Sequence, residues 1–150
     1  MAGIGPAERL TAYIRTYIIW TMTSKGSNTR IKWEGDSNRQ IRLWPASARE
    51  NFGAELQRLD NYERPLKSKP MGKSLPGVHE LFREDEALWY RLLYWLRDGW
   101  IYVLHCFNKK TNQTSKSDIK TAKDRMKIVE QREDEPFVEE NDDKEVEKSA

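Results

Sequence analysis

Two stretches of the chain place apolar residues at the spacing of an α-helix. In the first, which follows Pro45 and ends near Asn61, these residues are Ala48, Phe52, Leu56 and Leu59. Proline is tolerated in the first turn of a helix, so we expect an amphipathic helix of about 15 residues here. In the second, Ser117 is a plausible N-cap, and the stripe formed by Ile119, Ala122, Met126 and Val129 predicts a helix that reaches about Gln131.

Between these helices, β-branched and aromatic residues form three extended runs, which cover residues 78–82, 88–96 and 100–107. Asp98 and Gly99 separate the last two runs and favour a type I′ turn, so these runs predict a β-hairpin. Apolar residues lie on both faces of this hairpin, which places it at the centre of a sheet. Residues 31–33 predict an edge strand, and the proline- and lysine-rich residues 64–77 predict a loop without regular structure.

The turn also predicts which residues face each other across the hairpin. Counting outward from Asp98 and Gly99, Arg91 lies opposite Cys106 and Leu92 lies opposite His105. Side chains alternate between the two faces of a strand, so Arg91 and His105 are expected on opposite faces unless a β-bulge intervenes. The predicted order of elements is that of an α+β domain.

The near-neutral charge of the chain hides two opposed parts. The formal net charge is +2, but residues 133–150 hold nine acidic and two basic residues, which gives −7 there and leaves +9 on residues 1–132. A basic domain of this kind suggests a partner that is a polyanion. The acidic tail has too few apolar residues to pack, so we expect it to be disordered. We therefore divide the chain into an N-terminal extension (1–28), a domain (29–132) and the tail (133–150).

Cysteine and histidine are too few for a disulfide or a zinc site. Cys106 is the only cysteine, and His79 and His105 are the only histidines. Residues 10–20 are apolar but are interrupted by Arg15, and they are too short to span a bilayer, which needs about 20 apolar residues. They also do not fit a signal peptide, because Arg15 lies inside the apolar run. We expect a cytoplasmic protein that does not enter a membrane and uses no metal or other cofactor.

Four short motifs follow one another between about residues 30 and 130. They are LPGVHEL at 75–81, YRLLY at 90–94, LHCFNKKT at 104–111 and DIKTAKDR at 118–125. In this combination and order they closely resemble the phage-derived branch of the RelE/HigB toxin superfamily, whose members belong to type II toxin–antitoxin systems.

The resemblance implies a RelE-like α+β domain, in which an antiparallel sheet of mostly three to four strands packs against N-terminal helices and a C-terminal helix. It also implies a ribosome-dependent endoribonuclease that enters the ribosomal A site and cuts messenger RNA. The implied partner that holds it inactive is a cognate antitoxin, of the helix-turn-helix type found in HigA-like proteins. Two other functions stay open: a ParE-like toxin that inhibits DNA gyrase, and a non-catalytic RNA-binding module.

RNA can be cut without a metal when a 2′-hydroxyl attacks the adjacent phosphate, which requires proton transfer and positive charge beside the phosphate. The resemblance assigns these catalytic roles to Arg91, Lys109 and Lys110. Arg91 lies within an apolar strand, so we expect it either to clamp a phosphate on an open sheet face or to pair with Glu80 or another carboxylate. Adjacent residues of an extended segment point in opposite directions, so one lysine is expected to act, and we favour Lys110.

Arg83 and Lys116 are the residues that we expect to bind substrate. The family motif usually has arginine directly after "EL", where this sequence has Phe82 with Arg83 next. Because a step of one residue along a strand reverses the face, Arg83 is expected to miss the position of the family arginine. His105 is expected to be packed and hydrogen-bonded rather than a general base. Arg125 is expected on the surface of the last helix, or against the antitoxin.

Overall fold

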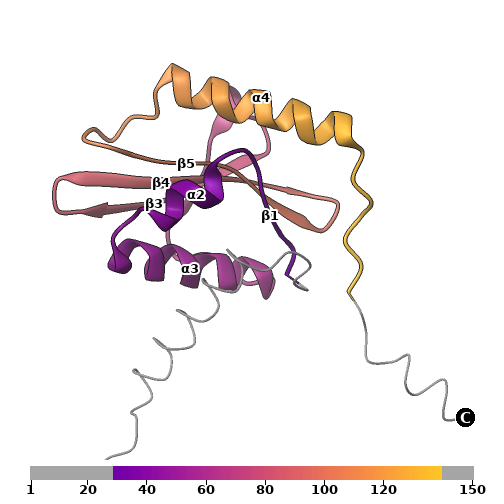
Figure 1. The fold of residues 1–150 in the computed structure, drawn as a ribbon, viewed down its shortest axis with the longest axis horizontal. Helices are drawn as coiled ribbons and strands as arrows, with labels where there is room; N and C mark the ends of the chain where they lie inside the picture. Colours follow the sequence, from indigo (N-terminus) through magenta and orange to yellow (C-terminus); the bar gives the residue numbers. More distant parts are fainter. Residues whose placement is uncertain (1–28, 140–150) are drawn as a thin grey trace, which may run out of the picture.

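A computed structural model describes residues 29–139 as helices packed on a five-stranded sheet (Figure 1). The predicted extension, residues 1–28, and residues 140–150 of the predicted tail lie outside the described residues. The elements in chain order are β1 (Ile31–Trp33), α2 (Ser37–Arg42), α3 (Ala46–Asp60), β2 (Ser68–Pro70), the short 3-10 helix η1 (Gly72–Ser74), β3 (Val78–Asp85), β4 (Leu88–Arg97), β5 (Trp100–Lys109) and α4 (Lys116–Arg132).

The sheet has the order β1-β5-β4-β3-β2, so the predicted hairpin of β4 and β5 lies inside it. Its turn is confirmed, because Asp98 and Gly99 both have positive φ angles, 52° and 81°, as a type I′ turn requires. β1 pairs in parallel with β5, and the other pairs are antiparallel. The expectation of three to four strands was too low, because the segment 64–77 contains the edge strand β2 and η1 rather than a loop alone.

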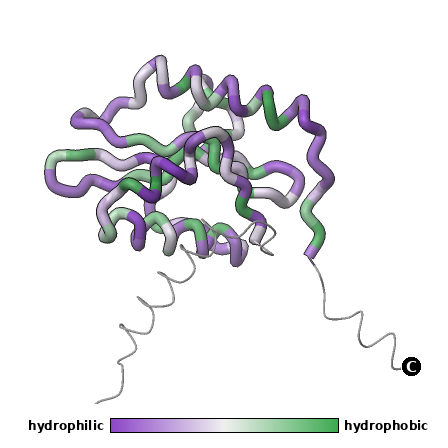
Figure 2. The backbone as a smooth tube through the Cα atoms, in the orientation of Figure 1, coloured by the Kyte–Doolittle hydropathy of each residue, from purple (hydrophilic) through white to green (hydrophobic). Residues whose placement is uncertain are grey.

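Helices cover both faces of the sheet (Figure 1). We call the two sides the α3 face, which also carries α2, and the α4 face. The apolar strands lie between the more hydrophilic helices and loops (Figure 2). The core on the α3 face includes Ile41, Phe52, Leu56, Leu81 and Val103, and the core on the α4 face includes Val78, Leu93, Leu104, Phe107 and Ala122.

The helix predicted after Pro45 is confirmed as α3, and its four predicted apolar residues are all buried. The helix α4 is also confirmed, but it begins two residues earlier than expected. Its N-cap is Ser115 rather than Ser117, because the Ser115 hydroxyl accepts a hydrogen bond from the Asp118 backbone N–H. The helix α2 was not predicted, since a helix of six residues is too short to show an apolar stripe. Within residues 29–139, no helix is both long and apolar enough to cross a membrane.

A β-bulge changes the predicted pairing of the hairpin. Tyr94 pairs with Val103 as expected, but Leu93 pairs with His105, so Leu104 has no partner residue on β4. From there onward the register is shifted by one residue, and Arg91 pairs with Phe107 instead of Cys106. The bulge therefore brings His105 to the α4 face, the same face as Arg91, which corrects the expectation that they lie on opposite faces.

The first part of the acidic tail is packed against the domain. Phe137 lies edge-on to Trp100, with ring centroids 5.0 Å apart, and its backbone N–H donates to the Asp98 carbonyl at 2.9 Å. Asp134 accepts from the Tyr102 hydroxyl at 2.9 Å and pairs with Lys32 at 3.3 Å. The expectation of disorder from residue 133 onward is therefore wrong for residues 133–139, because one aromatic ring and one carboxylate find partners on the hairpin and β1.

Candidate functional site

Most of the candidate residues gather on the α4 face where β5 ends and α4 begins. The chain leaves β5 at Lys109, forms the loop of residues 110–115 and enters α4 at Lys116. The Ser115 side chain fixes the first turn of α4 in two ways, since its oxygen accepts from the Asp118 N–H at 3.2 Å and its hydroxyl donates to Asp118 Oδ2 at 2.6 Å. This double contact aims the Asp118 carboxylate at the end of β5.

Asp118 receives two side chains from β5. Lys109 forms an ion pair with Asp118 Oδ2, and His105 Nε2 lies 2.8 Å from Asp118 Oδ1. Burial by itself would raise the pKa of Asp118, but the hydrogen bonds from Lys109, Ser115 and His105 outweigh it and hold that pKa below its usual value. Asp118 is therefore a fixed negative charge that positions Lys109, whose side chain is 24% exposed.

His105 is held from both of its ring nitrogens. Its Nε2 contacts Asp118, and its Nδ1 lies 3.4 Å from Arg125 Nη1. Because the guanidinium can only donate, Nδ1 is the acceptor, and the neutral ring carries its proton on Nε2. Burial lowers the pKa of His105 and outweighs the opposite effect of Asp118. The ring is a packed and hydrogen-bonded group, as expected, without a free nitrogen for a proton transfer.

Arg125 extends this network toward the start of α2 rather than lying on the surface of α4. Its guanidinium donates to the Leu104 carbonyl and to Asp36 Oδ1, each at 2.7 Å, and its side chain is 16% exposed. The expectation of a surface residue is thus wrong, because the unpaired Leu104 of the bulge offers its carbonyl to this side chain. The result is a chain of polar contacts that runs from Asp36 through Arg125, His105 and Asp118 to Lys109.

Arg91 lies on the same face but is buried. Its side chain is 1% exposed and forms an ion pair with Glu80, which is also 1% exposed. The other end of the guanidinium donates to the backbone carbonyl and the side-chain oxygen of Asn112, in the loop after β5. Of the two expectations for Arg91, pairing with Glu80 is the one that the structure shows. In this arrangement the guanidinium holds the loop 110–115 on the sheet and does not face an open surface.

Glu80 also binds two residues at the rim of this buried pair. Thr114 donates to Glu80 Oε2 at 3.2 Å, and Lys69 of β2 lies 3.8 Å from Glu80 Oε1. The Lys69 side chain is 49% exposed and lies 5.2 Å from the centre of the Phe82 ring. Lys69 was missed from the sequence because its segment has the composition of a loop, and only its pairing with β3 brings it to this face.

The other candidate residues lie outside this cluster. Lys110 and Lys116 are exposed at the two ends of the loop 110–115. Arg83 points to the α3 face, where it lines a small pocket of about 270 Å³ beside α3, and its neighbour Phe82 takes the place on the Arg91 side. Phe82 and Arg83 thus lie on opposite faces, as the alternation along a strand predicts.

The cluster offers cations rather than a set of metal ligands. Among residues 29–139, no three His, Cys, Asp or Glu side chains lie close enough together to hold a metal ion. Lys109 is a partly exposed cation and Lys69 a half-exposed one at the rim of the cluster, and Lys110 and Lys116 add exposed charge. Such a group of side chains can attract a phosphate and stabilise negative charge that develops on it.

Comparison with known proteins gives one family match. Residues 39–127, more than half of the chain, match the family described as "Phage derived protein Gp49-like (DUF891)". The matched region begins in α2 and ends in α4, and it contains the whole hairpin, the loop 110–115 and Asp118. No protein with a curated description matches the chain.

Proposed function

Because the chain belongs to the Gp49-like family of phage-derived proteins, a RelE/HigB-like toxin family of toxin–antitoxin systems, we propose that it is a toxin that cuts messenger RNA on the ribosome and so stops translation. The observation that carries this proposal is the partly exposed Lys109 at the end of β5, which Asp118 holds in a fixed position. It lies in the motif LHCFNKKT, at the point where the family resemblance expects a catalytic lysine.

The proposed reaction is the attack of a 2′-hydroxyl on the adjacent phosphorus. The bond from phosphorus to the 5′-oxygen breaks, the 2′-hydroxyl gives its proton to a water molecule, and the leaving 5′-oxygen takes one from a lysine ammonium, which gives a 2′,3′-cyclic phosphate and a 5′-hydroxyl. Lys109 and Lys110 are proposed to stabilise the charge that develops on the phosphate oxygens, and a lysine ammonium can also protonate the leaving oxygen. His105 keeps its proton on Nε2, where it donates to Asp118, and so helps to position that carboxylate.

The remaining candidate residues take supporting roles in this proposal. Arg91 is a positioning residue, since its guanidinium ties the loop 110–115 to Glu80. Lys116 is exposed at the start of α4 and is proposed to contact the RNA backbone near the loop. Arg83 lies on the other face, so its proposed contact is with ribosomal RNA rather than with the phosphate that is cut.

The proposed partners follow from the family. A cognate antitoxin, of the helix-turn-helix HigA-like type, is proposed to neutralise the toxin by covering the cations around the loop 110–115. The ribosomal A site and its messenger RNA are the proposed target, which places the protein's activity in the cytoplasm. A gene for a helix-turn-helix protein next to the gene for this chain is the expected companion.

A translation assay with purified ribosomes tests the proposal. The protein is added to ribosomes programmed with a short messenger RNA, and the new 5′ ends are mapped with and without ribosomes. We expect cuts that need the ribosome and that decrease at least tenfold in Lys109→Ala and in Lys110→Ala. Lys127→Ala, which removes an exposed lysine from the far part of α4, is the matched control and should cut as the wild type does.

The burial of Arg91 favours one alternative, a non-catalytic RNA-binding protein with this fold. The reason is that the buried Arg91 guanidinium cannot contact a phosphate during cleavage. Under that alternative the protein binds RNA, but neither lysine variant changes the pattern of 5′ ends. If expression stops growth, breaks DNA and induces the SOS response without cutting messenger RNA, the target is DNA gyrase and the nuclease proposal is wrong.

A further inference from the structure

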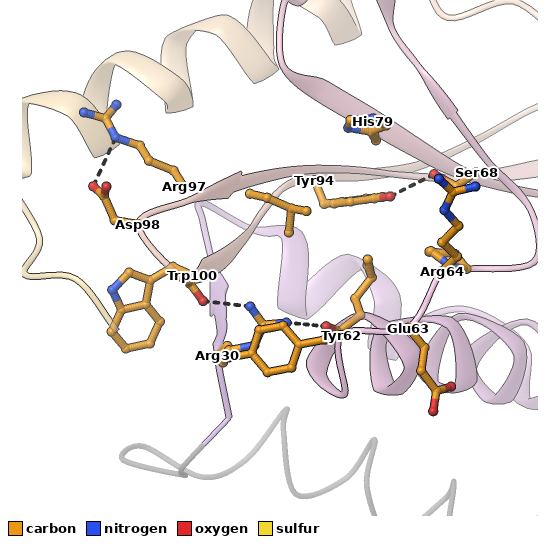
Figure 3. Close-up of a pocket in the computed structure, with 14 residues that line it drawn as sticks. Arg30, Tyr62, Glu63, Arg64, Ser68, His79, Tyr94, Arg97, Asp98 and Trp100 are labelled. Atoms are coloured by element: carbon orange, nitrogen blue, oxygen red, sulfur yellow. Dashed lines mark hydrogen bonds and ion pairs between the residues drawn. The ribbon is translucent and has the colours of Figure 1, made fainter. Parts of the chain in front are cut away.

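A larger pocket lies on the α3 face at the end of the sheet where the β4–β5 hairpin turns (Figure 3). It has a volume of about 770 Å³ and is enclosed by the segment after α3, by β2 and β3, and by the hairpin tip. This volume is in the range of pockets that hold small molecules. Lys109, His105 and Arg91 do not line it, so it is separate from the proposed cleavage site.

Tyr62 stands at the mouth of this pocket in a costly backbone conformation. It is the second residue after α3, its φ angle is 62°, and its side chain is 66% exposed. A positive φ is unfavourable for a bulky residue, and glycine or asparagine would adopt it more easily. The Arg30 guanidinium lies 3.8 Å from the centre of the Tyr62 ring and supports it from one side. An aromatic ring is thus held open to solvent where packing does not require it.

A second aromatic pair forms part of the floor of the pocket. The His79 ring stacks on the Tyr94 ring, with centroids 5.6 Å apart and planes 22° apart. The Tyr94 hydroxyl is bound to the Ser68 hydroxyl at 2.8 Å, as Figure 3 shows. His79 Nδ1 is buried and has no hydrogen-bond partner among the described residues. Because this nitrogen is closed to solvent, it is not available to a ligand, and the pair serves as an aromatic base for the pocket.

The charges around the pocket favour an anionic group at one end. Arg64 is exposed and stands beside Ser68 (Figure 3). The two carboxylates of the lining do not oppose it: Asp98 is paired with Arg97 at 3.6 Å, and Glu63 points away from the pocket (Figure 3). The pocket therefore combines the exposed Tyr62 ring with the Arg64 guanidinium, which has no partner among residues 29–139.

We propose that this pocket binds one unpaired nucleotide of a single-stranded RNA. The base stacks on Tyr62, and its phosphate pairs with Arg64. Unpaired bases are the part of RNA that proteins recognise by stacking on aromatic rings, and arginine binds phosphate in a bidentate way. The pocket and the proposed cleavage site lie on opposite faces of the sheet, so this binding does not depend on the nuclease proposal.

Fluorescence anisotropy with the full chain tests this assignment. The probe is a fluorescein-labelled RNA of twelve nucleotides of mixed sequence, used single-stranded and paired with its complement, and adenosine 5′-monophosphate is the competitor. We expect tighter binding of the single strand, and a loss of about tenfold in affinity for Tyr62→Ala and for Arg64→Ala. Tyr62→Phe keeps the ring and should bind within about twofold of the wild type.

Arg39→Ala is the matched control for Arg64→Ala, because Arg39 is an arginine of α2 with a side chain that is 76% exposed and does not line the pocket. Far-UV circular dichroism confirms that each variant is folded. The assignment is wrong if Tyr62→Ala binds as the wild type does, if Arg39→Ala loses as much as Arg64→Ala, or if the duplex binds as tightly as the single strand. The assignment is also wrong if adenosine 5′-monophosphate binds as tightly as the RNA, because the ligand of the pocket is then a free nucleotide and not an RNA strand.

Discussion

The buried ion pair between Arg91 and Glu80 keeps Arg91 away from a substrate, and the contribution of this pair can be measured as a free energy of unfolding. Both side chains are 1% exposed, and Arg91 also holds Asn112 of the loop 110–115. Removal of one partner of a buried pair typically costs about 3–5 kcal/mol, because it leaves the other charge buried and unpaired. Lys69 lies 3.8 Å from Glu80 and can compensate in part, so we expect Arg91→Ala to cost about 3 kcal/mol, near the lower limit.

A loss of this size is easily resolved, because a domain of this length has a free energy of unfolding of about 5–15 kcal/mol. We would follow unfolding in urea by tryptophan fluorescence, since the Trp89 ring lies 5.4 Å from the Arg91 guanidinium. Arg97→Ala on the same strand is the control. The Arg97 side chain is 37% exposed, and its ion pairs with Asp98 and Glu130 are long, so that variant should lose no more than about 1 kcal/mol.

The double variant Arg91→Met with Glu80→Met tests whether the loss of stability in Arg91→Ala comes from the unpaired charge of Glu80. Replacement of both charges by apolar groups should restore most of the stability that the single variant loses, because no buried charge is then unpaired. If Arg91→Ala costs no more than Arg97→Ala, the buried pair does not exist in solution. Arg91 would then be free to bind a phosphate, and our assignment of a positioning role would be refuted.

Three further predictions address other parts of the structure. Burial lowers the pKa of His105, so the neutral ring contributes its full stability above about pH 6.5, and this contribution decreases as the pH falls toward the lowered pKa. An NMR titration of the His105 ring should give a midpoint below 6.5. His105→Gln should weaken the pH dependence of the free energy of unfolding between about pH 7.5 and 5.5. Gly35→Ala should cost about 2 kcal/mol in urea unfolding, because Gly35 has a φ of 54° and a Cβ there would overlap the Arg125 guanidinium; a loss below about 0.5 kcal/mol would contradict this. Phe137→Ala should release residues 133–139 and cost about 1 kcal/mol. Faster hydrogen exchange of the backbone amide at position 137 and a change in Trp100 fluorescence should show it, and an unchanged exchange rate would mean that the tail does not dock.

The sequence was sufficient to predict those elements whose structure depends on residues close together in the chain. The four apolar residues of α3 lie on one side of a helix by their spacing alone, and the structure buries all of them. Asp98 and Gly99 specify the hairpin turn because few residue pairs tolerate two positive φ angles. The order of the short motifs indicated the family, which the match over residues 39–127 then showed.

The sequence could not determine which side chains meet at the candidate site. The bulge at Leu104 moves His105 to the α4 face, and it depends on how two strands fit each other rather than on either strand alone. Arg91 was predicted either to be open to a phosphate or to be paired, and the pair with Glu80 and the contact with Asn112 settle its position. These partners are 11 and 21 residues away in the chain.

The sequence by itself therefore determined the helices, the hairpin, the basic character of the domain and the motifs of its family. The tertiary structure alone decided that Lys109 rather than Lys110 joins the network of Asp118, that Arg91 is buried, and that Phe137 packs the start of the acidic tail on Trp100. The physical reason is that periodicity and turn preference arise from interactions between neighbours in the chain. The burial and pairing of a charge depend on residues that only the folded sheet brings together.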